Sequence, residues 1–258
     1  MITSGTMRRH AARASLAVGF MCSFATAGLA SDTLSRGSLP DVARAFEDAA
    51  LRVNDWQPAE PVRWTRPIFL AIADGGGMRA LAPEIEASVR QMAAIARISV
   101  TRVDANDPRR NFVVRQADPG GRAACRAGIY SQAGHITSVE VEIWLGGRGS
   151  VSRCINHEVL HGFGFRSHAH AAASILSYKQ TRQTDLSAVD RVMLETLYDP
   201  RLRPGMNVAS ATSTACSVIA EKLRVPARDA GAFCGGREPA GRQVSALSGR
   251  GRSREHQQ

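Results

Sequence analysis

Residues 157–161 read His-Glu-Val-Leu-His, and this stretch decides which fold the chain is expected to have. An α-helix turns by about 100° per residue, so residues four positions apart lie on one face, one turn apart. His157 and His161 would therefore direct two imidazoles at one point, and neutral imidazole nitrogens suit Zn²⁺. Glu158 would act there as general base and then as general acid. The stretch predicts a zinc-binding helix that carries a catalytic carboxylate.

The residues after this motif bear on a third metal ligand. Gly164 stands three positions beyond His161, where a glycine can end a helix in a left-handed turn and reverse the chain. The reversal would bring a further side chain back toward the metal. Three outcomes stay open: His168 as the third ligand, His170 as the runner-up, or a site without a third histidine.

This part of the chain resembles the metzincin clan of zinc peptidases. The metzincin pattern is HExxHxxGxxH, followed by a tight "Met-turn" often written S-I-M-S-Y and then by a helix. The matching positions are His157, Glu158, His161, Gly164 and residues 174–178, which read Ser-Ile-Leu-Ser-Tyr. The resemblance extends over residues 136–200. The block 154–206 also looks like bacterial exported proteins with a metzincin-like core.

Two positions depart from the metzincin pattern. Ser167 occupies the place of the third histidine and His168 follows it, so the loop is one residue longer. Leu176 replaces the methionine, which in metzincins forms an apolar floor beneath the metal and which leucine matches in size. The resemblance implies that Tyr178 stabilises a developing oxyanion. The alternative for Tyr178 is a tyrosine that packs at a turn.

The resemblance implies a single α+β domain of the zincin type. It would have a mixed twisted sheet, a long backing helix, an active-site helix and C-terminal helices. Apolar periodicity along the chain agrees with this class. It predicts helices over 41–53, 78–98, 186–198 and 209–223, a further helix that begins near Ser150 or Ser152, and strands over 62–74, 99–103, 111–115, 127–130 and 136–145. The start of the 186–198 helix is expected at Thr184 or Asp185.

The two ends of the chain differ from its middle. Three arginines precede an uncharged stretch that closes on Gly28-Leu29-Ala30, which predicts a signal peptide over residues 1–30. Residues 236–258 are rich in Gly, Arg, Ser and Gln and are predicted to be a disordered basic tail. Residues 31–235 would then be the metallopeptidase domain. Residues 31–60 could be either an inhibitory prosegment or the first helix of that domain.

Cysteine usage fits an exported chain. Removal of the signal leaves Cys125, Cys154, Cys216 and Cys234, and an even number in an exported protein suggests disulfides. Four cysteines allow three pairings. We favour Cys125–Cys154 with Cys216–Cys234, because each bridge closes a modest local loop.

The formal net charge of +10 says little about partners. Residues 1–30 contribute +3 and residues 236–258 another +3, so the body carries about +4. No array of basic and aromatic residues accompanies this charge, which argues against nucleic-acid binding.

These features together predict an exported bacterial zinc endopeptidase, periplasmic or secreted. Its partner would be a peptide or protein substrate, presented to an edge strand at 127–130 or 136–145 as in metzincins. We expect a monomer without nucleic acid and without stable membrane insertion after signal cleavage. The alternative is a catalytically inactive metzincin-like envelope protein with a binding or structural role.

Overall fold

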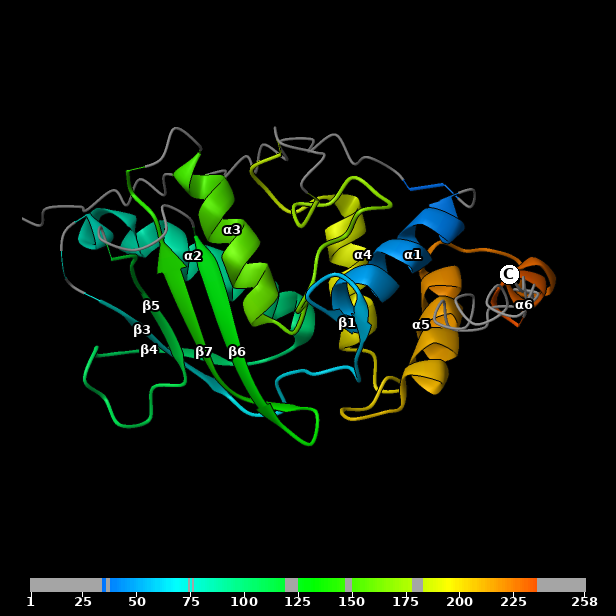
Figure 1. Cartoon of the computed structure of the whole chain (residues 1–258), viewed down its shortest axis with the longest axis horizontal. Coiled ribbons are helices and arrows are strands. Elements are labelled where there is room, and N and C mark those ends of the chain that lie inside the picture. Colours follow the sequence, from blue (N-terminus) through cyan, green and yellow to red (C-terminus); the bar gives the residue numbers. More distant parts are fainter. Residues whose placement is uncertain are drawn as a thin grey trace, which may run out of the picture. The chain divides into compact units, whose positions relative to one another are not determined.

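The structure is a computed structural model that describes residues 34–35, 38–73, 75, 77–118, 125–146, 150–177 and 183–235. The predicted signal peptide, the predicted tail and Tyr178 lie outside these residues. The described chain has an α+β fold with a five-stranded mixed sheet, a two-stranded hairpin and six helices (Figure 1).

The elements follow one another along the described chain with these bounds: α1 (Leu39–Ala50), β1 (Arg52–Val53), β2 (Gln57–Pro58), β3 (Ile68–Ile72), α2 (Met78–Ala96), β4 (Val100–Val103), β5 (Phe112–Gln116), β6 (Arg126–Gln132), β7 (His135–Ile143), α3 (Val151–Gly162), α4 (Ala188–Leu197), α5 (Val208–Lys222) and α6 (Ala227–Cys234).

The sheet has the strand order β4-β3-β5-β7-β6. The first four strands of this order pair in parallel, and β6 pairs antiparallel to β7. The interior strand β3 is an unbroken apolar run, as expected for a strand covered on both faces. The predicted strand over 136–145 is present as β7. Its Val139, Val141 and Ile143 are fully buried and Glu140 is exposed, while Glu142 is buried and paired with two arginines. This order leaves β6 at an edge of the sheet.

Helices α2 and α3 pack against each other and against the sheet. Helix α2 contacts β3 and β4, whereas α3 contacts β6 and β7 (Figure 1). Close approach of α3 depends on Gly162, because a Cβ at this position would lie 2.8 Å from the Phe112 ring. The sheet therefore fixes the position of α3, the helix that carries the histidine motif.

A second group of helices completes the core. Helices α1, α4 and α5 contact one another, and α6 packs on α5. The inward side chains of α1, among them Val42, Ala45, Phe46 and Ala49, are at most 1% exposed. Helix α1 is thus an integral part of the hydrophobic core.

Most of the predicted elements are present, with ends that differ by a few residues. The expected strand over 62–74 is shorter, and β3 starts only at Ile68. The expected start of the fourth helix at Thr184 or Asp185 is wrong, because Ser187 caps α4 in a reciprocal pair of hydrogen bonds with Asp190. The hairpin β1–β2 and helix α6 were not predicted at all.

Both favoured disulfides are present. Cys125, next to β6, is bonded to Cys154 on α3, and Cys216 on α5 is bonded to Cys234 on α6. The first bridge joins the edge strand to the motif helix. Among the described helices, none has the length and apolar character needed to cross a bilayer.

Candidate metal centre

Helix α3 brings the first two histidines together as expected. The helix starts after Ser150, whose hydroxyl accepts a hydrogen bond from the backbone N–H of Arg153 (3.3 Å). His157 and His161 follow one turn apart, and their Nε2 atoms are 3.1 Å apart. Two nitrogens bound to one tetrahedral Zn²⁺ at 2.0–2.1 Å would be separated by about 3.3 Å. The two rings are therefore spaced for a shared metal ion.

His168 completes a group of three imidazoles. Each of His157, His161 and His168 offers one ring nitrogen, and these three atoms all lie within 4.8 Å of one another. The ring of His168 is 5.5 Å from that of His157 and 5.1 Å from that of His161, measured between centroids. His170 is exposed and lines a different pocket, with Ser38 and Asp41. Of the two candidates for the third ligand, His168 is the one that lies beside the motif helix.

The other nitrogen of each ring faces an acceptor. Nδ1 of His157 lies 2.8 Å from the carbonyl oxygen of Ile175, and Nδ1 of His161 contacts that of Phe165. Nδ1 of His168 lies 2.9 Å from the carboxylate of Asp55. Because these oxygens only accept, each Nδ1 carries the proton and donates it. Nε2 of each ring is then the nitrogen that a metal ion would bind, the arrangement that metal-binding histidines have in proteins.

The two Nε2 atoms lie close enough to share a proton or a metal ion. Two lone pairs at 3.1 Å repel each other unless a proton or a metal ion lies between them. Burial opposes the proton, because it lowers the pKa of His157 to about 4 and that of His161 to about 3. Both imidazoles are thus neutral near pH 7, which is the form that binds zinc. The donor set and its protonation fit Zn²⁺.

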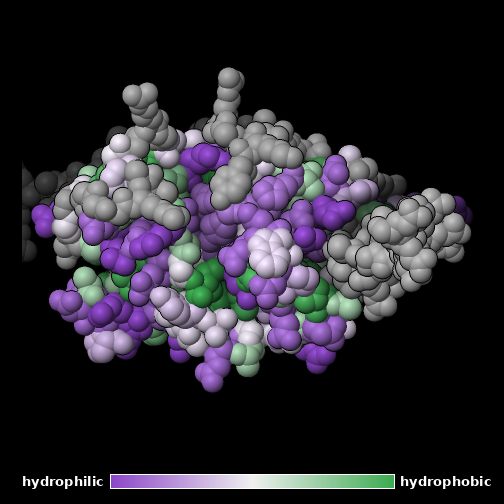
Figure 2. Space-filling view, viewed as in Figure 1, coloured by the Kyte–Doolittle hydropathy of each residue, from purple (hydrophilic) through white to green (hydrophobic). Residues whose placement is uncertain are grey.

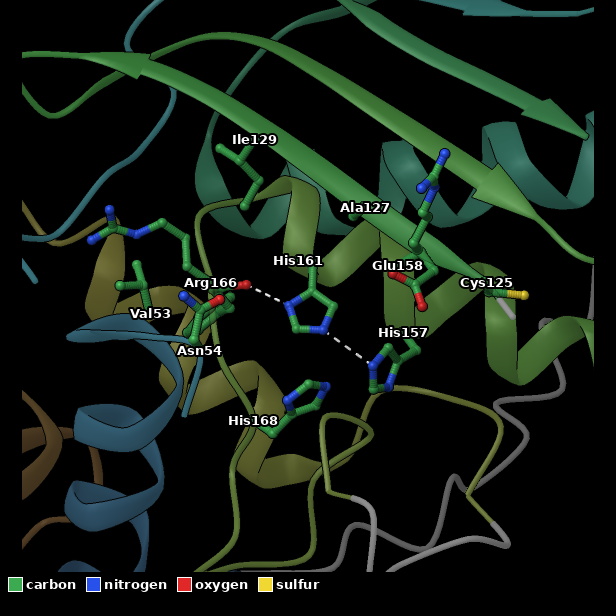
Figure 3. Close-up of a pocket in the computed structure, with 12 residues that line it drawn as sticks. Val53, Asn54, Cys125, Ala127, Ile129, His157, Glu158, His161, Arg166 and His168 are labelled. Atoms are coloured by element: carbon green, nitrogen blue, oxygen red, sulfur yellow. Dashed lines mark hydrogen bonds between the residues drawn. The ribbon is translucent and has the colours of Figure 1, made fainter. Parts of the chain in front are cut away.

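Glu158 lies in the same cavity as the three histidines (Figure 3). This cavity has a volume of about 530 Å³. The Glu158 side chain is only 6% exposed, and burial raises its pKa to about 8. A carboxyl group that exchanges its proton near neutral pH suits general acid–base chemistry.

The walls of the cavity come from distant parts of the chain. The edge strand β6 contributes Ala127 and Ile129, and the hairpin contributes Val53 and Asn54 (Figure 3). In the view of Figure 1, hydrophilic residues predominate on the face that carries α3, β6 and the hairpin (Figure 2). The cavity thus lies between the edge strand β6 and the short hairpin β1–β2.

Gly164 allows the chain to reverse after α3, as predicted. The helix ends at Gly162, and Gly164 follows with a φ of 115°. Its backbone N–H donates to the carbonyl of His161 (2.8 Å). A Cβ at this position would lie 2.1 Å from the carbonyl oxygen of Val62, so only glycine fits. This tight reversal directs the chain back toward the two helical histidines.

The segment that resembles the Met-turn supports the first histidine. Leu176 is fully buried, and the preceding Ile175 supplies the carbonyl that accepts from His157. The turn is held by Asp190 of α4, whose carboxylate accepts from the hydroxyl of Ser174 and from the N–H of Ile175 (3.0 Å). Burial raises the pKa of Asp190 although these hydrogen bonds oppose the shift. Tyr178, predicted to assist at an oxyanion, lies outside the described residues.

Asp55 is a residue of the site that the sequence reasoning missed. It lies between β1 and β2 and contacts both Ser167 and His168, from a distance of more than one hundred residues along the chain. Burial alone would raise its pKa, but hydrogen bonds from Ser167 and His168 outweigh this effect and hold it at about 2. The only local signal was Asn54-Asp55, residue types that tolerate the positive φ values found here (53° and 65°).

One protein family matches this chain. The family model described as "Protein of unknown function (DUF2927)" matches residues 40–215. No curated protein matches the chain. The matched range begins in α1 and ends within α5, so it includes the whole sheet, the three histidines and Glu158. Because the match spans more than half of its residues, the chain belongs to the DUF2927 family.

Proposed function

We propose that this protein is an exported zinc-dependent endopeptidase with a metzincin-like site. The observation that carries the proposal is the convergence of three imidazoles beside a buried carboxylate. Each ring already donates from Nδ1, which leaves Nε2 as the metal ligand. His157, His161 and His168 would hold the ion.

The proposed chemistry divides between the metal and Glu158. When bound, Zn²⁺ acts as a Lewis acid that lowers the pKa of water and polarises a substrate carbonyl. Glu158 accepts the proton of the attacking water and later donates it to the amine that leaves. Its burial supports this role, since a carboxyl with a pKa of about 8 can both take up and release a proton near neutral pH.

The edge strand supports a peptide as the substrate. One edge of β6 pairs with β7, and its other edge has no partner strand among the residues that the structure describes. Ala127 and Ile129 of β6 line the cavity that holds the histidines. An extended peptide can pair with such an edge through backbone hydrogen bonds, which positions one of its peptide bonds at the metal. Of the two strands considered from the sequence, β6 is the one at the edge.

Two observations support export. Disulfides form and persist in oxidising compartments, and all four cysteines outside the predicted signal peptide are paired. The predicted signal peptide adds to this. A periplasmic or secreted location follows as part of the proposal.

The test is peptide hydrolysis by zinc-loaded protein with a substitution at the proposed base. Glu158→Gln keeps the size of the side chain and removes the carboxylate. We expect turnover of a peptide library to fall by roughly 10²–10⁴-fold, with bound zinc still stoichiometric. The matched control is Glu140→Gln, the same change on an exposed residue of β7, which should leave turnover unchanged.

Two results would overturn the proposal. Proteolysis that survives Glu158→Gln in a clean preparation would show that Glu158 is not the base. Stoichiometric zinc in the wild type with no turnover of any peptide would instead favour the catalytically inactive binding or structural role.

A further inference from the structure

The hairpin β1–β2 reaches the metal centre from the N-terminal part of the chain. Its strands are only two residues long each, and Asn54 and Asp55 between them both have positive φ. Asn54 lines the cavity, as does His168 (Figure 3). Such a short hairpin is marginal on its own, so contacts with the rest of the fold must hold it.

The contacts that hold the hairpin converge on one carboxylate oxygen. Oδ1 of Asp55 accepts from the hydroxyl of Ser167 (2.5 Å), the backbone N–H of His168 (3.0 Å) and Nδ1 of His168 (2.9 Å). The Ser167 hydroxyl in turn accepts from the backbone N–H of Asp55 (2.6 Å). Asp55 therefore binds both the backbone and the side chain of the third histidine.

This arrangement explains how the longer loop still delivers a histidine. Ser167, at the position where the metzincin pattern has its third histidine, is only 1% exposed and points at Asp55. Its backbone N–H donates to the carbonyl of Ala49, at the end of α1 (3.1 Å). With Ser167 fixed in this way, the next residue is the one that faces the motif helix.

The third histidine also differs from the other two in its outer partner. His157 and His161 donate to backbone carbonyls, whereas His168 donates to a carboxylate. A carboxylate behind a ligating imidazole fixes the ring orientation and increases its basicity, and loss of such partners costs 10–100-fold in metal affinity. His168 lies in a loop, so it depends on such a partner more than the two histidines of the helix.

We propose that Asp55 is the positioning residue of the metal centre, which makes His168 a ligand and couples the hairpin β1–β2 to metal binding. The proposal rests on the proposed zinc site. It adds that the site is incomplete without a segment that lies more than one hundred residues before the motif.

The expected loss of zinc affinity follows from the solvent exposure of Asp55 and His168. The side chain of Asp55 is 40% exposed and that of His168 is 16% exposed. Solvent therefore screens part of the interaction, and we expect the lower end of the range for such partners, about tenfold in zinc affinity.

The experiment measures zinc affinity of the full chain by competition with a chromophoric chelator. Asp55→Ala should weaken zinc binding about tenfold. Asp55→Asn keeps an oxygen that can accept from His168 and should restore part of the loss. Gln57→Ala is the control, because Gln57 is an exposed residue of the same hairpin that does not line the cavity.

A spectroscopic measurement separates positioning from folding. The visible spectrum of Co²⁺-substituted protein reports the number and geometry of the ligands. We expect Asp55→Ala to change this spectrum and Gln57→Ala to leave it unchanged, even if both variants melt at a lower temperature. If Asp55→Ala does not fold, Asp55→Asn supplies the comparison, with a smaller spectral change expected because its amide oxygen can still accept from His168.

The outcomes distinguish this inference from the proposed function. Wild-type zinc affinity and an unchanged Co²⁺ spectrum in Asp55→Ala, with zinc binding lost in His168→Ala, would overturn the role of Asp55 and leave the metal site standing. A wild-type protein that binds no zinc would overturn both.

Discussion

Replacement of Gly164 by alanine tests the path of the chain from the end of α3 to His168. Gly164 has a φ of 115°, where a non-glycine residue is strained by about 1–3 kcal/mol. The new Cβ would lie 2.1 Å from the carbonyl oxygen of Val62 and 3.1 Å from a methyl group of Leu197. The closest neighbour is a backbone atom, which cannot move aside as a side chain can.

Backbone strain and overpacking together give the expected loss in the free energy of unfolding. Overpacking in a well-packed region typically costs a further 1–3 kcal/mol. Together with the backbone strain, Gly164→Ala should lower the free energy of unfolding by about 2–6 kcal/mol. Relief of the clash must displace the chain just before His168, so zinc affinity should fall as well.

The assay is urea unfolding followed by circular dichroism, with zinc affinity measured on the fraction that folds. Gly231→Ala is the matched control. Gly231 lies inside α6, and a Cβ there would have no neighbour within 4 Å. This control should gain about 0.5–1 kcal/mol, because alanine favours helix over glycine. A Gly164→Ala protein with wild-type stability and wild-type zinc affinity would refute the described path from α3 to His168.

Three further predictions follow from the contacts around the site. Replacing both Cys125 and Cys154 by alanine should lower the free energy of unfolding by about 3.6 kcal/mol, because the bridge closes a loop over a sequence separation of 29. A loss below about 1 kcal/mol in urea unfolding would contradict this expectation. Removing zinc with a chelator should lower the melting temperature, because zinc at 100 times its Kd stabilises the folded state by about 2.7 kcal/mol; an unchanged melting curve would argue against a metal in the native protein. Asp190→Ala should lower the free energy of unfolding by about 1–3 kcal/mol for each donor left unpaired. It should also weaken zinc binding, because the segment whose Ile175 carbonyl orients His157 loses its anchor. Unchanged zinc affinity in a competition titration would show that the role of Asp190 is purely structural.

The sequence alone was sufficient for features that depend on local geometry. The four-residue spacing of His157 and His161 places both rings on one helical face whatever the rest of the chain does. Apolar periodicity predicted the strand over 136–145, and Gly164 was recognisable as the point of chain reversal. Each of these depends on neighbours within a few residues.

The tertiary structure decided what depends on contacts between distant segments. Sequence spacing left His168 and His170 as rivals, and the choice depends on Asp55 and on the end of α1, which lie far from both in the chain. The hairpin that carries Asp55 was missed because two-residue strands have too few positions for periodicity to be visible. Strand order likewise decided that β6 forms the edge beside the cavity. A local pattern can identify metal ligands on a helix, whereas a ligand in a loop is selected by the packing of the whole fold.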